Sequence, residues 1–416
     1  MNNLVDIQTI EEASERLNGV AKNTPLQFSK RLSNFYKANI YFKREDLQEV
    51  RSYKIRGAYN LIKSLSEQEK KKGVVCASAG NHAQGVAYSC NALKIHGTIF
   101  MPVVTPLQKI NRVRHFGDGW VEIKVIGANF DESSKEAKEF AKKEQAIFVH
   151  PFDDERVIAG QGTIGKEIFE TLGDQIDFLL CPIGGGGLIS GVGSYLKQKC
   201  KKIKLIGVEA KGAPGMDSSI KAGKVITLEK IDPFVDGVAV KTVGTQTFQI
   251  ASRIVDQIIV VDEGQVCSTM IELYQNEGIV AEPAGALSIS ALNDLAEKIK
   301  GRTVVCILSG GNNDILRYPE IMEKSLVYMG LKHYFLIEFA QKPGQLKNLV
   351  NNALGPIDDI VRFEYIKKNS KETGPALVGI ELAKKEDLKP LLSKMNSLDI
   401  KYQIITSNDP LYSYLI

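Results

Sequence analysis

Residues 178–196 read FLLCPIGGGGLISGVGSYL, and this stretch decides the fold. The apolar run 178–183 predicts a β-strand buried on both faces, as in a parallel sheet, and residues 189–196 have the spacing of a helix. Four consecutive glycines between a strand and a helix are entropically costly, so they indicate backbone amides that approach a ligand closely. Because phosphate is a common ligand at a helix N-terminus, we expect a phosphate site, with a plain turn as the alternative. Its residues are Gly184, Gly185, Gly186, Gly187 and Leu188.

The same succession of an apolar run and a helical segment repeats between about residue 40 and residue 310. This alternation predicts an α/β fold of parallel sheets covered by helices, whose ligand sites form where strands end. Functional residues are therefore expected in the loops that follow the strands. The predicted strands are 74–78, 98–101, 121–126, 178–183, 205–208, 258–261 and 303–308.

Past about Gly330 the pattern becomes β-α-β-β-α-β, which predicts a separate ferredoxin-like domain. This part contains no cluster of glycine turns, nucleophiles or paired acids, so we interpret it as a binding or regulatory module. The tail 407–416 is expected to pack on it. The predicted strands are 333–339, 357–365, 377–382 and 400–405, and the predicted helices are 345–354 and 385–395.

The composition is that of an ordinary soluble globular protein. The 416 residues, 44% of them hydrophobic and 25% charged, carry a net charge of +4, which predicts two or three folding units and no nucleic-acid partner. Without a secretion signal or an apolar stretch of about 18 residues, we expect a cytosolic protein with no membrane contact. The six scattered cysteines indicate buried free thiols, and the Cys and His spacings predict no metal site.

Lys54 lies in the segment SYKIRGA, residues 52–58. Its apolar neighbours Tyr53 and Ile55 favour a lowered ammonium pKa and hence the free amine that imine formation requires. The alternative is a lysine that extends to solvent from the edge of the following helix.

A second candidate segment is CASAGNHAQG, residues 76–85, between a predicted strand and a helix that begins near Asn81 or His82. We expect Gly80 to tighten the turn and successive backbone amides to form a nest suited to a carboxylate, with Asn81 reaching a ligand oxygen. The alternative is an asparagine N-cap beside a histidine that bonds within the protein.

Of two further motifs, one contains a candidate ligand residue and the other fails to match its family pattern. Ser309, in the SGGNN segment 309–313 after the strand 303–308, could hydrogen-bond to a ring nitrogen, although a plain polar turn is the alternative. The run GQGTIGK at 160–166 matches the first seven positions of a P-loop, but Glu167 stands where Ser or Thr must bind magnesium. We interpret that run as a loop and helix.

Together and in this order, these segments resemble the fold-type II pyridoxal-phosphate (PLP) enzymes, and the chain is similar to the biosynthetic threonine dehydratases. The resemblance spans nearly the whole chain. It implies a catalytic domain at 1–325 with two-lobed, tryptophan synthase β-like parallel sheets, the smaller lobe at about 50–150, and an ACT-like regulatory domain at 330–416. PLP is the implied cofactor.

The resemblance also implies roles for particular residues. Lys54 would be the Schiff-base lysine, beside Tyr53 where the family usually has phenylalanine, and Ser309 would face the pyridine nitrogen. Gly311 replaces a frequent alanine, which should not disturb Ser309. The glycine loop Gly184–Leu188 would hold the phosphate, and Asn81 would contact the phenolic oxygen. The substrate carboxylate would be bound by the loop Ser78, Ala79, Gly80, Asn81 and His82.

The implied activity is that of a threonine ammonia-lyase, which forms 2-oxobutanoate and ammonia in the first step of isoleucine biosynthesis. Lys54 would act as the general base at Cα. Ser309 could not keep the ring nitrogen protonated as an aspartate would, which favours prompt elimination. Ala79 occupies the position where racemase relatives carry a serine as second acid or base. A PLP-dependent serine dehydratase, racemase or β-replacement enzyme is the alternative, and a non-catalytic amino-acid-binding regulator is a third possibility.

The sequence motifs do not by themselves distinguish threonine from serine as substrate, and they do not identify the effector or the oligomeric state. Threonine and serine differ by one methyl group, worth only about 1–3 kcal/mol in a binding site. The resemblance implies a branched-chain amino acid as effector, with isoleucine as feedback inhibitor, and a homotetramer or homodimer. Some relatives bind a cation where Glu209 and Asp217 stand, with two solvated acids as the alternative.

Overall fold

The computed structural model describes residues 4–365, 372–406 and 409–415. The chain divides into two compact units, which are described separately. The first comprises Met1–Glu263 and Leu273–Asn313, and the second comprises Gly264–Glu272 and Asp314–Ile416.

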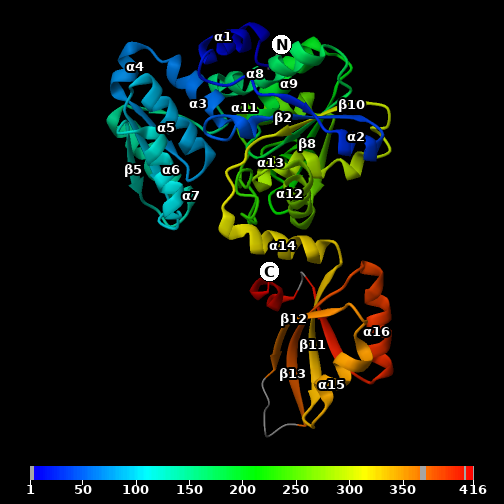
Figure 1. Ribbon diagram of the computed structural model, residues 1–416. Helices are drawn as coiled ribbons and strands as arrows, with labels where there is room; N and C mark the ends of the chain where they lie inside the picture. Colours follow the sequence, from blue (N-terminus) through cyan, green and yellow to red (C-terminus); the bar gives the residue numbers. More distant parts are fainter. Residues whose placement is uncertain (1–3, 366–371, 407–408, 416) are drawn as a thin grey trace. The chain divides into compact units, whose positions relative to one another are not determined.

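The first unit contains a six-stranded sheet in the order β1-β2-β10-β7-β8-β9. Only the edge strand β1 is antiparallel, and the other neighbouring pairs are parallel. Helices α8 and α9 pack on one face and α13 on the other (Figure 1), so the two central strands, β10 and β7, are almost wholly apolar. The strands are β1 (Leu26–Phe28), β2 (Asn39–Arg44), β10 (Thr303–Leu308), β7 (Phe178–Pro182), β8 (Lys204–Ala210) and β9 (Gln257–Val261).

A second, smaller sheet in this unit has the order β5-β4-β3-β6 and is parallel throughout. Along β3, Val74 and Cys76 pack against one cluster of helical residues, and Val75 and Ala77 pack against another on the opposite face. This alternation follows from the period of two in a strand. The strands are β5 (Val121–Val125), β4 (Gly97–Met101), β3 (Val74–Ala77) and β6 (Ile147–Phe148).

The two parallel sheets confirm the predicted α/β class. All seven predicted strands of this part are present, and β1, β2 and β6 are additional. The six cysteines are free and buried, as expected, and Cys76, Cys181 and Cys306 lie in strands. The helices of the first unit are α1 (Ile7–Leu17), α2 (Lys30–Tyr36), α3 (Lys54–Lys63), α4 (Glu67–Lys72), α5 (Asn81–Leu93), α6 (Leu107–Gly117), α7 (Phe130–Glu144), α8 (Glu155–Leu172), α9 (Gly187–Lys199), α10 (Gly215–Ala222), α11 (Thr245–Ile254) and α13 (Pro283–Ser290), with α12 (Glu263–Glu277) divided between the units.

The P-loop-like run at 160–166 lies wholly inside helix α8, which corrects the expectation of a loop followed by a helix. Its glycines serve close helix packing. A Cβ on Gly160 would lie 2.6 Å from the backbone oxygen of Arg56 in α3. Across the other interface, a Cβ on Gly191 of α9 would lie 2.2 Å from the backbone oxygen of Ile158 in α8. Helix α8 is therefore held against α3 and α9 at a separation that permits no side chain at these points.

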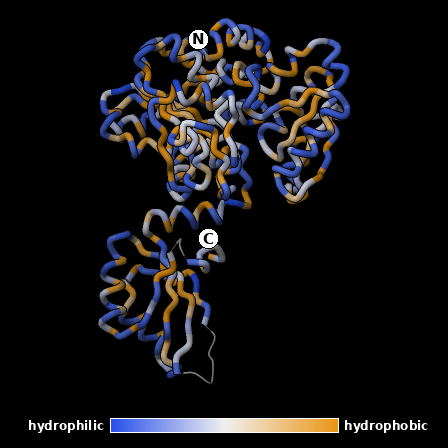
Figure 2. Tube along the Cα trace, turned by 180° about the vertical axis from the view of Figure 1, so that it is seen from behind, coloured by the Kyte–Doolittle hydropathy of each residue, from blue (hydrophilic) through white to orange (hydrophobic). Residues whose placement is uncertain are grey.

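The second unit is an antiparallel sheet in the order β12-β13-β11-β14, which confirms the predicted ferredoxin-like β-α-β-β-α-β domain. Figure 2 shows the apolar residues concentrated along its strands. Alternate strand residues such as Phe335, Ile337, Val378 and Ile380 form its core. Its elements are α14 (Tyr318–Tyr328), β11 (Lys332–Ala340), α15 (Gln345–Asn348), β12 (Asp359–Tyr365), β13 (Thr373–Glu381), α16 (Leu388–Ser397) and β14 (Lys401–Ile405).

The segment 345–354, predicted to be one helix, contains two kinds of helix. Only Gln345–Asn348 is α-helical, and Leu349–Ala353 forms a π-helical turn. The turn lets both Leu349 and Ala353 reach the domain core, where they are fully buried. In the tail, Pro410–Tyr414 forms a short 3-10 helix, and Gln403 of β14 donates to Asp409. Residues 407, 408 and 416 of the predicted packing segment lie outside the described residues.

Candidate functional site

The candidate site lies in the first unit, in loops that follow four parallel strands. The carboxyl ends of neighbouring parallel strands meet at one edge of a sheet, where ligand sites of α/β folds form. The lysine segment at the start of α3 joins these loops through hydrogen bonds. The loops comprise residues 78–82 after β3, 149–153 after β6, 184–188 after β7 and 309–313 after β10.

Lys54 is the first residue of α3 and is partly buried. Its Nζ donates to the backbone oxygen of Pro151 over 2.9 Å and lies 5.3 Å from the centre of the Tyr53 ring. Burial lowers the pKa of the Lys54 ammonium to about 8, against the opposing charge of Glu282. The amine is therefore closer to its free base than a surface lysine, as imine chemistry requires.

Backbone contacts join the lysine segment to the serine loop. The amide of Tyr53 donates to the carbonyl oxygen of Ser309 over 3.1 Å, and Ser52 forms an antiparallel bridge with Gly310. Burial raises the pKa of the Tyr53 phenol, so this hydroxyl stays neutral. These contacts place Lys54 next to the loop of Ser309, although the two are more than 250 positions apart in the sequence.

The asparagine loop is open on one side. Helix α5 begins at Asn81 with Gly80 as N-cap, so Asn81 is not itself the cap. The φ angle of Gly80 is −133°, and a Cβ there would meet no atom within 4 Å, so neither the backbone conformation nor the packing requires glycine at this position. Within the described residues, the amides of Ala79, Asn81 and His82 donate to no acceptor. They are available to a carboxylate.

Ser78 and His82, at the two ends of this loop, have partners inside the protein. The hydroxyl of Ser78 accepts from the amide of Gly80 over 3.2 Å. The imidazole Nε2 of His82 lies 2.9 Å from the backbone oxygen of Val149, and burial lowers the pKa of His82 to about 3. The neutral imidazole therefore joins the loops after β3 and β6, and the backbone amide of His82 remains free for a ligand.

The glycine loop has both close packing and free amides. Gly186 has φ +95°, a conformation that favours glycine, and a Cβ on Gly185 would lie 2.3 Å from the Phe152 ring. Across the part of the chain that the structure describes, the amides of Gly184, Gly185, Gly186, Gly187 and Leu188 have no acceptor. A row of free amides at the start of α9 suits an anion such as phosphate.

Ser309 is buried, and its hydroxyl donates to the backbone oxygen of Ala284 over 3.1 Å. The lone pairs of this hydroxyl are free to accept another hydrogen bond, and rotation about Cβ–Oγ would let it donate instead. Two buried polar groups of the adjoining segments, the hydroxyl of Ser52, a residue that bridges to Gly310, and the side-chain amide of Asn313, have no partner among the described residues.

Sequence inspection missed four contributors to the site. Pro151 supplies only a carbonyl oxygen, Phe152 a ring against Gly185, and Asn312 an amide that donates to Asn81 over 2.8 Å. Glu282 is buried and accepts from the Asn81 side chain over 2.7 Å. The one available signal was the glutamate of the EPAGA run at 282–286, which by itself indicates a helix start.

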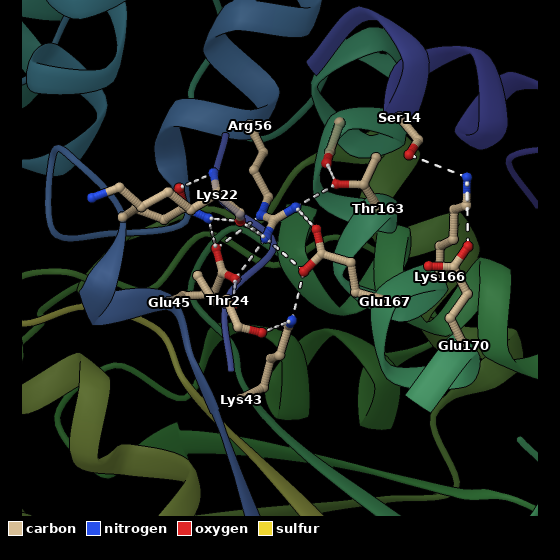
Figure 3. A network of polar contacts seen from close by, with 12 residues as sticks. Ser14, Lys22, Thr24, Lys43, Glu45, Arg56, Thr163, Lys166, Glu167 and Glu170 are labelled. Atoms are coloured by element: carbon tan, nitrogen blue, oxygen red, sulfur yellow. Dashed lines mark hydrogen bonds and ion pairs between the residues drawn. The ribbon is translucent and has the colours of Figure 1, made fainter. Parts of the chain in front are cut away.

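A buried ionic cluster surrounds Arg56, two residues after Lys54 (Figure 3). The guanidinium of Arg56 donates to both carboxylate oxygens of Glu45, to Glu167 and to Thr163, and Lys43 pairs with Glu167. Although burial raises the pKa of Glu45, the charge and hydrogen bonds of Arg56 outweigh it and lower that pKa. The cluster ties the first turn of α3 to β2 and α8, and so fixes the backbone that carries Lys54.

Glu209 and Asp217 do not form a pair of solvated acids. Glu209 is fully buried and accepts from the amides of Met216 and Asp217 at the start of α10, whereas Asp217 pairs with Lys221. Burial raises the pKa of Glu209 to about 7. No group of three or more His, Cys, Asp or Glu in the described parts is arranged to hold a metal ion. None of the described helices is long and apolar enough to cross a membrane.

Comparison with known families identifies the chain. The model of the pyridoxal-phosphate dependent enzymes matches residues 17–310, which includes all the loops above except the last residues of the serine loop. The chain belongs to the pyridoxal-phosphate dependent enzyme family. Residues 323–415 match the C-terminal regulatory domain of threonine dehydratase.

Individual members of the PLP-dependent family extend the match over the full length. The chain is 53% identical over 412 residues to the L-threonine dehydratase biosynthetic IlvA of Halalkalibacterium halodurans, covering 99% of each chain. It is 51% identical over 415 residues to the same enzyme of Bacillus subtilis, covering 100% of this chain and 98% of that one.

Solved structures of PLP-dependent enzymes share the fold. The processed threonine deaminase isoform 2 of Solanum lycopersicum is 38% identical, with a TM-score of 0.72 over 78% of this chain and 96% of that one. Maize serine racemase is 31% identical, with a TM-score of 0.71 over 78% and 98%. These neighbours confirm the expected fold-type II architecture of the first unit.

The residues present fit PLP, the cofactor of the family. Its phosphate requires several donors and its aldehyde requires one amine, and the free amides of 184–188 and the Lys54 amine supply these. The buried hydroxyl of Ser309, which donates to the backbone oxygen of Ala284, can rotate to donate to an unprotonated ring nitrogen instead. Each requirement is met by a side chain or amide that the protein itself leaves incompletely bonded.

Proposed function

We propose that this chain is an L-threonine dehydratase, which converts L-threonine into 2-oxobutanoate and ammonia as the first step of isoleucine biosynthesis. The observation that carries the proposal is the Lys54 amine in contact with the loop after β6, whose Phe152 packs against Gly185 and Gly187 of the glycine loop, where the backbone amides are free. The identity to L-threonine dehydratases over the full length supports threonine as the substrate.

Each group of residues has one task in the proposed reaction. The amides of Gly184–Leu188 hold the cofactor phosphate, Ser309 meets its ring nitrogen, and Tyr53 lies beside it. The amides of Ala79, Asn81 and His82, with Gly80 and Ser78 shaping the loop, bind the substrate carboxylate. Bound PLP supplies the electron sink for the electron pair at Cα.

Lys54 moves the proton at Cα. Once its Nζ has been released to the free amine, it accepts this proton as the substrate loses its β-hydroxyl. A lowered pKa keeps a useful fraction of that amine unprotonated near neutral pH. Loss of water followed by hydrolysis of the carbon–nitrogen bond balances to 2-oxobutanoate and ammonia.

Elimination is favoured over racemisation by the side chain at position 79. Racemisation needs a second acid or base on the opposite face of Cα, and the methyl group of Ala79 cannot transfer a proton. Serine racemases of maize and Dictyostelium discoideum have similar structures. A serine dehydratase, racemase or β-replacement activity is therefore the second candidate.

The C-terminal residues form the regulatory part of the enzyme. We assign the catalytic domain to 1–325, with its smaller lobe at about 50–150, and the ACT-like regulatory domain to 330–416. The match of residues 323–415 to a regulatory domain supports this assignment. The proposed effector is a branched-chain amino acid, with isoleucine as the inhibitor.

A cytoplasmic location and a homotetramer or homodimer complete the proposal. Six free thiols are typical of a reducing compartment. Cell fractionation would test the location, and light scattering of the purified chain would test the assembly.

One assay tests the activity and the alternative together. Purified enzyme is supplied with threonine, with serine, or with serine and a thiol, and the products are identified with and without isoleucine or valine. We expect 2-oxobutanoate from threonine, and less of it with isoleucine. D-serine or a thioether as the main product would reject the dehydratase proposal. Product formation that neither isoleucine nor valine changes would reject the proposed regulation by branched-chain amino acids.

A further inference from the structure

Glu282 lies at the junction of the asparagine and serine loops. It is the N-cap of α13, and its backbone amide donates to the carbonyl oxygen of Gly310 over 3.2 Å. The side chain is almost completely buried, at 5% exposure. Its Oε1 accepts from Nδ2 of Asn81 over 2.7 Å, and its Oε2 accepts from the amide of Asn312 over 3.2 Å.

These contacts determine how the Asn81 amide is oriented. Oδ1 of Asn81 accepts from Nδ2 of Asn312 over 2.8 Å, while Nδ2 of Asn81 donates one of its two hydrogens to Glu282. The second hydrogen on Nδ2 remains for a ligand. Without the carboxylate, only the hydrogen bond from Asn312 to Oδ1 would hold the Asn81 amide in this orientation.

Glu282 also brings a charge to the lysine. A charged Glu282 raises the pKa of the Lys54 ammonium, and it contributes to the raised pKa of Tyr53. Burial, together with the charge of Asp236, raises the pKa of Glu282 to about 7, whereas the hydrogen bonds of Asn81 and Asn312 and the charge of Lys109 oppose this. The Glu282 carboxyl thus changes charge near neutral pH.

We propose that Glu282 is a positioning residue of the cofactor site, whose carboxylate orients Asn81 and places a negative charge near Lys54. The inference rests on the proposed function, together with the expected contact of the Asn81 side chain with the phenolic oxygen of PLP. Glu282 acts through these two side chains and needs no contact with the substrate.

The test compares the full-length wild type with Glu282→Gln in their affinity for PLP. Glutamine is uncharged like the protonated acid, although its amide nitrogen cannot accept the hydrogen bond that Oε2 receives from Asn312. The Kd for PLP of Glu282→Gln should therefore be closer to that of the wild type at about pH 6, below the range in which Glu282 ionises, than at higher pH. At about pH 8.5 the wild type gains charge-assisted hydrogen bonds, which are stronger than neutral ones. We expect the Kd of Glu282→Gln to exceed that of the wild type by about tenfold there.

Two further variants separate this effect from a general loss of structure. Glu263→Gln alters another carboxylate that is partly buried, has a raised pKa and accepts a backbone amide, that of Gly212. The Kd of Glu263→Gln for PLP should be close to that of the wild type at both pH values. Asn312→Ala removes the donor to Asn81 but keeps the charge of Glu282, so it should weaken binding by the same factor at both pH values.

The absorption band of bound PLP, followed during the titrations, gives the Kd values and separates two kinds of failure. If the Kd of Glu282→Gln divided by that of the wild type were the same at the two pH values, this inference would be overturned, whereas the proposed function would stand. If the wild type developed no visible band, the cofactor assignment would fail and this inference with it. Circular dichroism at both pH values verifies that the variants are folded.

Discussion

Nζ of Lys54 donates to the backbone oxygen of Pro151, and the next residue, Phe152, lies against Gly185 and Gly187. One short turn therefore connects the Lys54 amine to the glycine loop. Nδ1 of His150 accepts from the amides of Phe152 and Asp153, which keeps this turn in shape. A proline carbonyl is a suitable resting partner for an amine that must be released, because it offers a hydrogen bond without a charge.

Replacing Lys54 tests the assignment of the reactive amine. Lys54→Ala removes the group that would bond to the cofactor, so the purified variant should lack the visible absorption band and lose its dehydratase activity by at least about 1000-fold. Absorption spectroscopy and product formation measure the two effects. Lys63→Ala, at the exposed end of the same helix, is the control. A normal band in Lys54→Ala would refute the assignment.

Gly185→Ala should weaken cofactor binding. The new methyl group would lie 2.3 Å from the Phe152 ring, which must move and take the loop with it. We expect a Kd for PLP at least about tenfold higher, which corresponds to about 1.4 kcal/mol. Gly215→Ala places its Cβ at an ordinary 3.4 Å from Val243 and should bind PLP like the wild type. Equal affinities of the two variants would contradict the role given to the loop.

Arg56→Met should destabilise the first unit strongly. The change leaves the carboxylates of Glu45 and Glu167 without their main partner, and Glu45 is fully buried. Loss of one member of a buried ionic cluster costs about 3–5 kcal/mol. Urea unfolding followed by circular dichroism measures this. Arg302→Met breaks an exposed pair with Asp177 and should cost less than about 1 kcal/mol. Similar losses in the two variants would show that burial of the cluster is unimportant.

Glu209→Gln should flatten the pH dependence of stability. Burial raises the pKa of folded Glu209 from an ordinary 4.5 to about 7, so its protonated form stabilises the fold below pH 4.5, and this contribution is lost as the pH rises through about 7. The loss is on the order of 3 kcal/mol. Glutamine cannot ionise, so the decline in unfolding free energy between about pH 5 and pH 8 should be smaller.

Urea titrations across this range measure the slope for Glu209→Gln and the wild type. Glu229→Gln, a change of an exposed side chain, serves as the control. An unchanged slope in Glu209→Gln would mean that Glu209 stays ionised in its buried position.

The strands and loops of the site were predictable because their signals are local. An apolar run followed by glycine or serine, as at Gly184 and Ser309, can be recognised without knowledge of its neighbours. The same holds for the C-terminal domain, whose four strands follow one another along the chain as expected. The strand β6 has only two residues and leaves no periodic pattern to detect.

Partners that are distant in sequence could not be predicted. Glu282 resembles a helix cap until Asn81 is placed beside it, and any residue could have supplied the carbonyl oxygen of Pro151. Glu209 resembles a surface acid because its partners are backbone amides, which no side-chain pattern reveals. The run at 160–166 was misjudged because glycines that permit helix contact look like glycines of a loop.

The glycines between α3, α8 and α9 also limit how this sequence can evolve. At Gly160 and Gly191 the atom that blocks a side chain belongs to the opposite backbone, which cannot be trimmed by a compensating mutation. A change to alanine would require two helices to separate, and the start of α3 carries Lys54. A single mutation of either glycine therefore cannot leave the helix spacing intact, and relatives that retain a lysine at the start of α3 should also retain this narrow spacing.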